Sequence, residues 1–326
     1  MPLLRTISLL FLLCLATNVR TANAHPWGGL VVDAVGRIFF TFVCPMVGDS
    51  HVACVWRIDP GESEPKATLS AGSSPSDLVL TRTRDRQLFA AQRDLLRGKY
   101  QSQVWKLFAS GEHTNVLKPT RNPFHFTPEA YTVDEAGTLI FTHENKIYRH
   151  TLNGEISIIA GEDAGYFDGD LADARFERIS AMAWGPDSSL YFVDMDRLRR
   201  ISPSGEVSTI AEGVKEQDPE NLPFRGANII FDMAVDSLQN VYLAYYGNRR
   251  ILKVSPAGEI INLLDAEDLW SPHGIDVYDG EIYILESTVG VPEWWEFWKS
   301  VEIRPRVRKI NRNGDVEILY EYPRRK

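Results

Sequence analysis

Three side chains suited to binding a divalent metal ion occupy nearly equivalent places in different copies of a sequence repeat. Glu129 and His273 each stand where a short β-like segment begins, and Asp232 comes one residue after such a start. Carboxylate and imidazole groups are common metal ligands, and a bound calcium or zinc ion can activate water or polarise a carbonyl. If the three segments meet, the sequence predicts a metal-dependent hydrolase or lyase. The alternative is a polar channel without metal, with His273 bonded to backbone.

A second candidate site is an aromatic insertion between residues 291 and 298. Four aromatic side chains stand beside two acids there, and such patches often mark binding surfaces. The predicted ligand-binding residues are Trp294, Trp295, Phe297 and Trp298. The alternative is that this loop folds back and covers a sheet face.

Other polar residues have simpler explanations. His143, Asp194 and Glu286 each follow a β-rich run, where capping of a turn is the expected role. The acidic segment 162–170 lacks the ligand spacing of an EF-hand, so we expect a plain connection between repeats. The sequence contains no nucleophile elbow, Walker loop, dinucleotide fingerprint or zinc-protease motif.

The elements that must position these residues are strands in a repeat. Residues 179–210 contain four short apolar runs separated by Gly, Pro, Asp and Ser turns, which is a strand-and-hairpin pattern. The same pattern recurs five more times, at a spacing of roughly 40–50 residues that is typical of propeller blades. The sequence therefore predicts an all-β, six-bladed β-propeller of four-stranded blades. Its first strands begin at equivalent positions Gly28, Ser76, Glu129, Ser180, Phe231 and His273.

Radial stacking explains why such blades need one another. A four-stranded sheet has two faces to bury, and stacking around an axis buries both against neighbouring sheets. All six blades read as complete, so the sequence leaves no spare strand to clasp the ring. Either the two ends pack without a clasp, or the register is wrong by one strand.

The N-terminus is typical of a signal peptide. Arg5 precedes an apolar run from Ile7 to Ala16, and a small-x-small site ends at Ala24. We expect cleavage after Ala24, leaving residues 25–326 as one propeller in the periplasm or outside the cell, without a membrane span. Losing Arg5 and Arg20, and no acid, takes the net charge from −9 to −11. That charge argues against nucleic acid as a partner.

Two cysteines remain after this cleavage, Cys44 and Cys54. Both flank one hairpin of the first blade, and an oxidising compartment permits a local disulfide. Two buried free thiols are the alternative.

Several segments resemble the NHL repeat: residues 160–170 followed by Ala174–Phe176, then Gly247–Val254 and Arg306–Ile310. The chain is also broadly similar to gluconolactonase/regucalcin propellers and to peptidyl-amidating lyases. The latter resemblance implies a metal-ligating histidine at His273, in Ser271-Pro272-His273-Gly274. The other blades carry no matching histidine, and Gly28 and Gly29 stand where gluconolactonases have a metal-binding glutamate.

The function predicted first is therefore a binding module for a protein, peptide, glycan or small molecule, acting as a monomer. The alternative is a metal-dependent hydrolase or lyase, either lactonase-like or amidating-lyase-like, with its site at the mouth of the central channel. The sequence does not choose between an enzyme and a binding protein.

Overall fold

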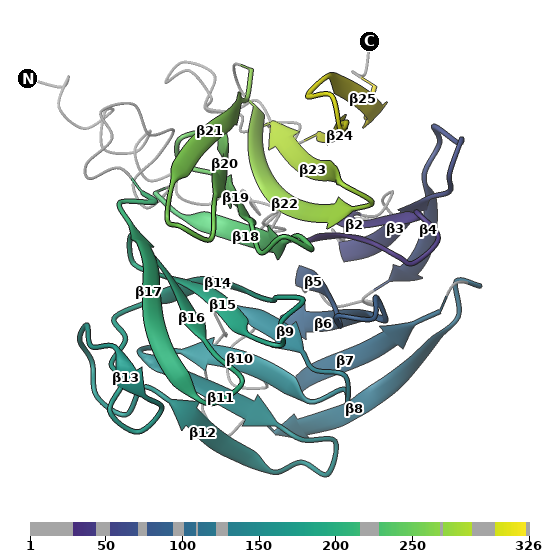
Figure 1. Ribbon diagram of the computed structural model, residues 1–326. Coiled ribbons are helices and arrows are strands. Elements are labelled where there is room, and N and C mark those ends of the chain that lie inside the picture. The colour runs from purple at the N-terminus through teal and green to yellow at the C-terminus, as the bar shows by residue number, and fades with distance from the viewer. Residues whose placement is uncertain are drawn as a thin grey trace, which may run out of the picture.

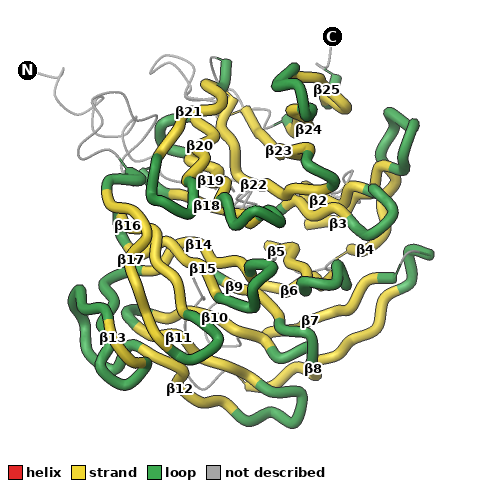
Figure 2. Tube along the Cα trace, in the orientation of Figure 1, coloured by secondary structure: helices red, strands yellow, loops and turns green. Residues whose placement is uncertain are grey.

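A computed structural model describes residues 29–43, 53–70, 77–93, 101–108, 110–121, 130–215, 228–267, 270–288 and 304–323. These residues form strands and turns and contain no helix (Figure 2). The described part of the chain accordingly offers no helix that could cross a membrane.

The first three blades follow one another along the chain. Blade 1 contains β1 (Leu30–Val32), β2 (Ile38–Val43), β3 (Ala53–Ile58) and β4 (Lys66–Ser70). Blade 2 contains β5 (Asp77–Arg82), β6 (Leu88–Arg93), β7 (Gln101–Leu107) and β8 (His113–Arg121). Blade 3 contains β9 (Tyr131–Val133), β10 (Leu139–His143), β11 (Lys146–His150) and β12 (Ile156–Ala160).

The other three blades continue the same plan. Blade 4 contains β14 (Ile179–Trp184), β15 (Leu190–Asp194), β16 (Arg197–Ile201) and β17 (Glu206–Glu212), with β13 (Gly169–Asp170) added beside β17. Blade 5 contains β18 (Ile230–Val235), β19 (Val241–Tyr245), β20 (Arg250–Val254) and β21 (Ile260–Asp265). Blade 6 contains β22 (Trp270–Tyr278), β23 (Glu281–Thr288), β24 (Pro305–Ile310) and β25 (Val316–Glu321).

The prediction of a six-bladed propeller is confirmed. The blades stand around a common axis, with the first main strand of each blade innermost (Figure 1). Apolar side chains alternate along the strands and pack between adjacent blades, as the two-residue period of a strand requires. Leu78 and Leu80 of blade 2, for example, pack with Val31 and Phe39 of blade 1. The core is therefore a ring of inter-blade layers.

The ring closes without a strand shared between the two chain ends. Each sheet consists of consecutive strands, and β1 of blade 1 packs directly against β22 of blade 6. Glycine permits this approach, because a Cβ atom on Gly274 would lie only 2.8 Å from the Leu30 backbone nitrogen. Of the two closures left open by the sequence, the structure has the one in which the ends pack without a clasp and the predicted register is right.

Blade 4 corrects one detail of the sequence analysis. We expected every blade to have four strands and residues 162–170 to be only a connection. Instead, β13 in this connection pairs with β17 through Gly169 and Asp170 and makes blade 4 five-stranded. The added strand covers an edge that would otherwise expose unpaired backbone groups.

Cys54 lies buried in β3 and is disulfide-bonded. Cys44 lies outside the described residues. The pairing of these two cysteines stays a prediction.

Candidate functional site

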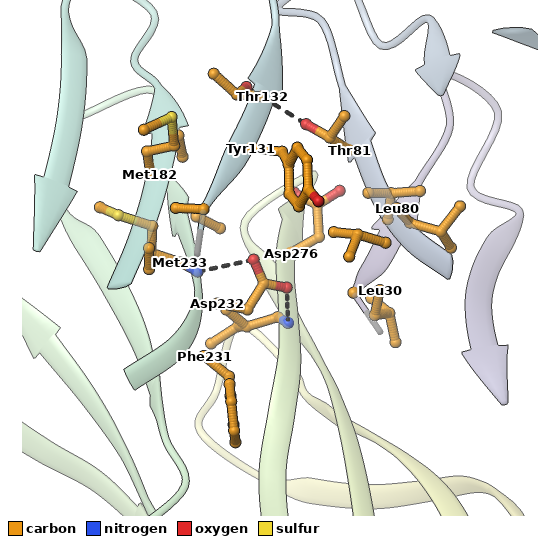
Figure 3. A pocket seen from close by; sticks show the side chains of 18 of the residues that line it. Leu30, Leu80, Thr81, Tyr131, Thr132, Met182, Phe231, Asp232, Met233 and Asp276 are labelled. Carbon is orange, nitrogen blue, oxygen red and sulfur yellow. Dashed lines mark hydrogen bonds between the residues drawn. The ribbon is translucent and has the colours of Figure 1, made fainter. Parts of the chain in front are cut away.

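The central channel is the main cavity in the described part of the protein. All six inner strands line it, and it offers about 80 Å³ to the centres of water molecules. One water needs roughly 10–15 Å³ by this measure, so the space holds several. The close view in Figure 3 shows apolar walls, including Leu30, Leu80 and Met182, around the two carboxyl groups of Asp232 and Asp276.

One end of the channel carries three bulged residues from consecutive blades. The pairing register shifts by one residue at Ser180 in β14, at Phe231 in β18 and at His273 in β22. All three line the channel. A β-bulge redirects a side chain, and bulges are common beside active sites. We call Ser180, Phe231 and His273 the bulge triad, and the end where they lie the bulge end. Their predicted equivalence within the repeat agrees with this geometry.

Members of the bulge triad differ in environment. The imidazole of His273 is buried. Phe231 is partly exposed and packs edge-on against Tyr246, with ring centroids 4.8 Å apart. Ser180 is buried, and its hydroxyl has no hydrogen-bond partner among the described residues. The bulge end thus brings an imidazole, an aromatic ring and a hydroxyl to one cavity.

Asp232 lies in the channel next to the bulge triad, and its oxygens face backbone amides. Oδ1 accepts a hydrogen bond from Met233 N at 2.9 Å, and Oδ2 accepts one from Ile275 N at 2.9 Å. Burial raises the pKa of Asp232 to about 8, although the N–H groups of Ile275, Met233 and Leu30 favour its ionised form. At neutral pH this carboxyl group is therefore mostly protonated.

Asp276 is buried in the same channel but stays ionised. Burial opposes its charge, yet Arg82 and Arg86 hold the pKa of Asp276 below its ordinary value. Arg82 donates to both carboxylate oxygens, with its closest contact at 2.7 Å from Nη2 to Oδ1. Asp276 also accepts a hydrogen bond from Val32 N at 2.8 Å. The two channel acids therefore differ in charge because only one has cationic partners.

Two arginines of blade 2 link the opposite end of the channel, where the inner strands turn outward. Arg84 contacts Glu135 in blade 3, at 2.7 Å from Nε to Oε1, and Ser188 in blade 4. Arg86 donates to the backbone oxygens of Val32 in blade 1 and Val277 in blade 6. These side chains cross between five blades, and we call this end the arginine end.

The structure brings together two of the three predicted metal ligands. Asp232 and His273 line the same channel, whereas Glu129 lies outside the described residues. Among the residues that the structure describes, no group of three His, Cys, Asp or Glu side chains is placed to hold a metal ion. The aromatic residues Trp294, Trp295, Phe297 and Trp298 also lie outside the described residues, so their role stays a prediction.

Asp194 and Glu286 occupy corresponding strand ends but form ion pairs there. Asp194 accepts hydrogen bonds from two backbone N–H groups, as expected of a cap, and also binds the buried Arg199 at 2.9 Å. Glu286 binds Arg306 and Arg308 between blades 5 and 6. His143 lies 4.0 Å from Glu144 at the end of β10. Burial of the first two acids makes them part of the packing of their blades.

Sequence reasoning missed Asp276, Arg82 and Arg86. Asp276 and Arg82 are 194 positions apart along the chain, and only closure of the ring brings them together. The one available signal was an acid three residues after His273, on a strand predicted to line the channel.

Comparisons with known proteins support the fold. No protein-family model matches the sequence, and no curated protein matches it. A solved streptogramin B lyase is 14% identical, with a TM-score of 0.50 over 91% of this chain and 83% of that chain. A protein of unknown function from Bacteroides thetaiotaomicron is 15% identical, with a TM-score of 0.55 over 79% of this chain and 66% of that chain. Virginiamycin B lyase from Staphylococcus aureus is 14% identical and covers 91% of this chain and 84% of its own, with a TM-score of 0.47. Identities this low show a shared propeller fold and leave the NHL resemblance a prediction.

Proposed function

We propose that this chain is a secreted or periplasmic binding propeller of the NHL type, whose ligand enters the central channel at the bulge end. The observation that carries the proposal is one cavity lined by all six inner strands, with the bulge triad at one end of it. Ligand sites are usually concave and mostly apolar, with a few polar groups that fix orientation. This channel has that composition.

The size and charge of the channel limit the ligand. Space of about 80 Å³ for water centres suits a small molecule or the end of a peptide or glycan. The charges of Asp276 and Arg82 already satisfy each other, and Asp232 is mostly neutral. Recognition therefore depends on shape, on the aromatic ring of Phe231 and on uncharged hydrogen bonds.

A Ser180→Phe substitution tests this site. The corresponding bulge in blade 5 already holds Phe231, and removing the Ser180 hydroxyl leaves no described group without a partner. The added ring should narrow the bulge end and weaken channel ligands by at least about tenfold, which corresponds to about 1.4 kcal/mol. Saturation-transfer NMR with a library of uncharged and charged fragments would identify the probes and measure this loss.

Ser204→Phe is the matched control, since Ser204 lies on the exposed turn between β16 and β17. Fragments that bind wild type and the Ser204 variant but not the Ser180 variant support the proposal. Fragments that bind all three proteins equally place the site elsewhere and contradict it.

The second candidate function is a metal-dependent hydrolase or lyase. It is favoured by one observation, that Asp232 and His273 line the same channel. Both Asp232 oxygens, however, accept backbone hydrogen bonds, and the carboxyl group is mostly protonated at neutral pH. A metal ion prefers a deprotonated carboxylate, so this environment favours the binding function.

Elemental analysis of wild type and a His273→Ala variant separates the two functions. Under metal-replete conditions we expect no stoichiometric metal in either protein. Stoichiometric metal in wild type that disappears in the variant would instead establish a metal centre. Lactones and hydroxyglycine peptides would then be the substrates to screen.

A further inference from the structure

The inner strands of a propeller have an unpaired edge. Each is the terminal strand of its sheet, so one row of its backbone groups faces the channel. A buried N–H group without a partner costs free energy comparable to a lost hydrogen bond. The need is greatest where blade 6 meets blade 1, because no strand exchange joins the chain there. We call this junction the seam.

Asp232 supplies acceptors to three blades at the seam. Its carboxyl group accepts N–H groups from Met233 in blade 5, Ile275 in blade 6 and Leu30 in blade 1. Gly29 leaves room for it, since a Cβ atom at that position would lie 3.5 Å from Oδ2. One side chain from blade 5 therefore reaches both strands that meet at the seam.

Asp276 continues this pattern on the other side of the seam. It belongs to blade 6, accepts Val32 N from blade 1 and binds Arg82 and Arg86 from blade 2. Arg86 in turn donates to the backbone oxygens of Val32 and Val277, on the two sides of the seam. Side chains from blades 2, 5 and 6 thus satisfy backbone groups where the ring closes.

We propose that Asp232 and Asp276 form an acid clasp, which holds the two ends of the propeller ring together in place of strand exchange. The clasp is a conformational device and does not depend on what the channel binds. It also assigns Asp232 a role that requires no metal ion.

Closure by this clasp is linked to a proton. The groups that face Asp232 are Asp276 and His273 on β22, Arg82 on β5, Arg86 on β6 and Tyr131 on β9, whereas β1 and β14 contribute no titratable side chain to the channel. Burial and the negative charge of Asp276 both raise the pKa of Asp232. Opening the seam to water would return this pKa to its ordinary value near 3.8. The closed ring therefore binds one more proton than the open ring between these two pKa values.

The sign of the pH effect follows from this difference. Rising pH favours the state with fewer protons, so the seam should open more readily as pH rises toward 8 and change little above it. The expected slope is at most about tenfold in the opening equilibrium per pH unit. Asp276 has the opposite dependence, because its lowered pKa makes its contribution fall away only in acid.

Amide hydrogen exchange across this pH range tests the proposal on the native protein. After correction for intrinsic exchange rates, protection of Val32 and Ile275 at the seam should fall by several-fold or more between about pH 6 and pH 8. Protection of Ile140, in β10 of blade 3, should stay constant. Constant protection at the seam, or an equal fall at all three amides, would overturn the clasp.

An Asp232→Asn variant checks the origin of the effect, because asparagine has the shape of the protonated acid but no titrating proton. Its seam amides should show no fall in protection between about pH 6 and pH 8. Asp236→Asn is the control, since Asp236 caps the outer turn of the same blade through Leu238 N and Asn240 N. The Asp236 variant should keep the wild-type pH dependence. A pH dependence that survives Asp232→Asn would also overturn the clasp, whereas the native measurement remains valid if that variant fails to fold.

Discussion

Replacing Arg199 with alanine is expected to lower the free energy of unfolding by about 3–5 kcal/mol. The Arg199 side chain is fully buried beside Asp194, which is also fully buried. The guanidinium binds Asp194 at 2.9 Å, Asp168 at 2.7 Å and the backbone oxygens of Arg175 and Phe167. Its removal leaves a buried carboxylate without its cation and leaves two carbonyls without their donor. Urea unfolding followed by tryptophan fluorescence measures the loss.

Arg197→Ala is the matched control for this experiment. Arg197 lies two residues away on β16 and pairs with the exposed Glu177 at 2.8 Å, with its guanidinium over the Tyr166 ring. Such a surface pair contributes about 1 kcal/mol or less. Equal losses in the two variants would show that burial of Arg199 does not set its contribution.

Gly161→Ala is expected to cost about 3 kcal/mol or more. Gly161 has a φ of 87°, where an L-residue is strained by about 1–2 kcal/mol. A Cβ atom there would also lie 2.2 Å from the Asn145 backbone oxygen and 2.6 Å from the Phe176 ring. Phe176 is fully buried against Phe192, so the ring cannot move without disturbing the layer between blades 3 and 4. Overpacking of this kind costs about 1–3 kcal/mol more.

Gly154 provides a control with the same backbone conformation. Its φ is also 87°, but no atom lies within 4 Å of a Cβ built there. Gly154→Ala should therefore lose only the backbone term of about 1–2 kcal/mol. Denaturant unfolding of both variants separates the two contributions. A Gly161 variant no less stable than the Gly154 variant would show that the contacts at Gly161 relax at little cost.

The sequence predicts the blades well because their causes are local. Turn residues and alternating apolar runs define each hairpin within a few tens of residues, and equivalent strand starts such as Ser180, Phe231 and His273 align by inspection. The same alignment correctly placed Asp232 and His273 at the channel. It could not show that a bulge redirects the triad, since a bulge changes the register and not the pattern of residue types.

The rest of the site was hidden because it depends on closure. Asp276 meets Arg82 and Val32 only after the two ends of the repeat array come together. No spacing along the chain encodes such contacts. The environment of Asp232 was also beyond the pattern, because its protonation is set by burial and by Asp276, and not by neighbours in sequence.

The absence of a shared blade has a consequence for how the chain folds. In the described sheets every strand pairs with a neighbour in sequence, apart from β13 beside β17. Such local contacts have a low entropic cost of loop closure, so each blade can form without waiting for the opposite end of the chain. The junction between blades 6 and 1 then forms late, after the folding barrier. Substitutions there, such as Gly274→Ala, should accelerate unfolding and leave the refolding rate nearly unchanged, which the two arms of a chevron plot would measure separately.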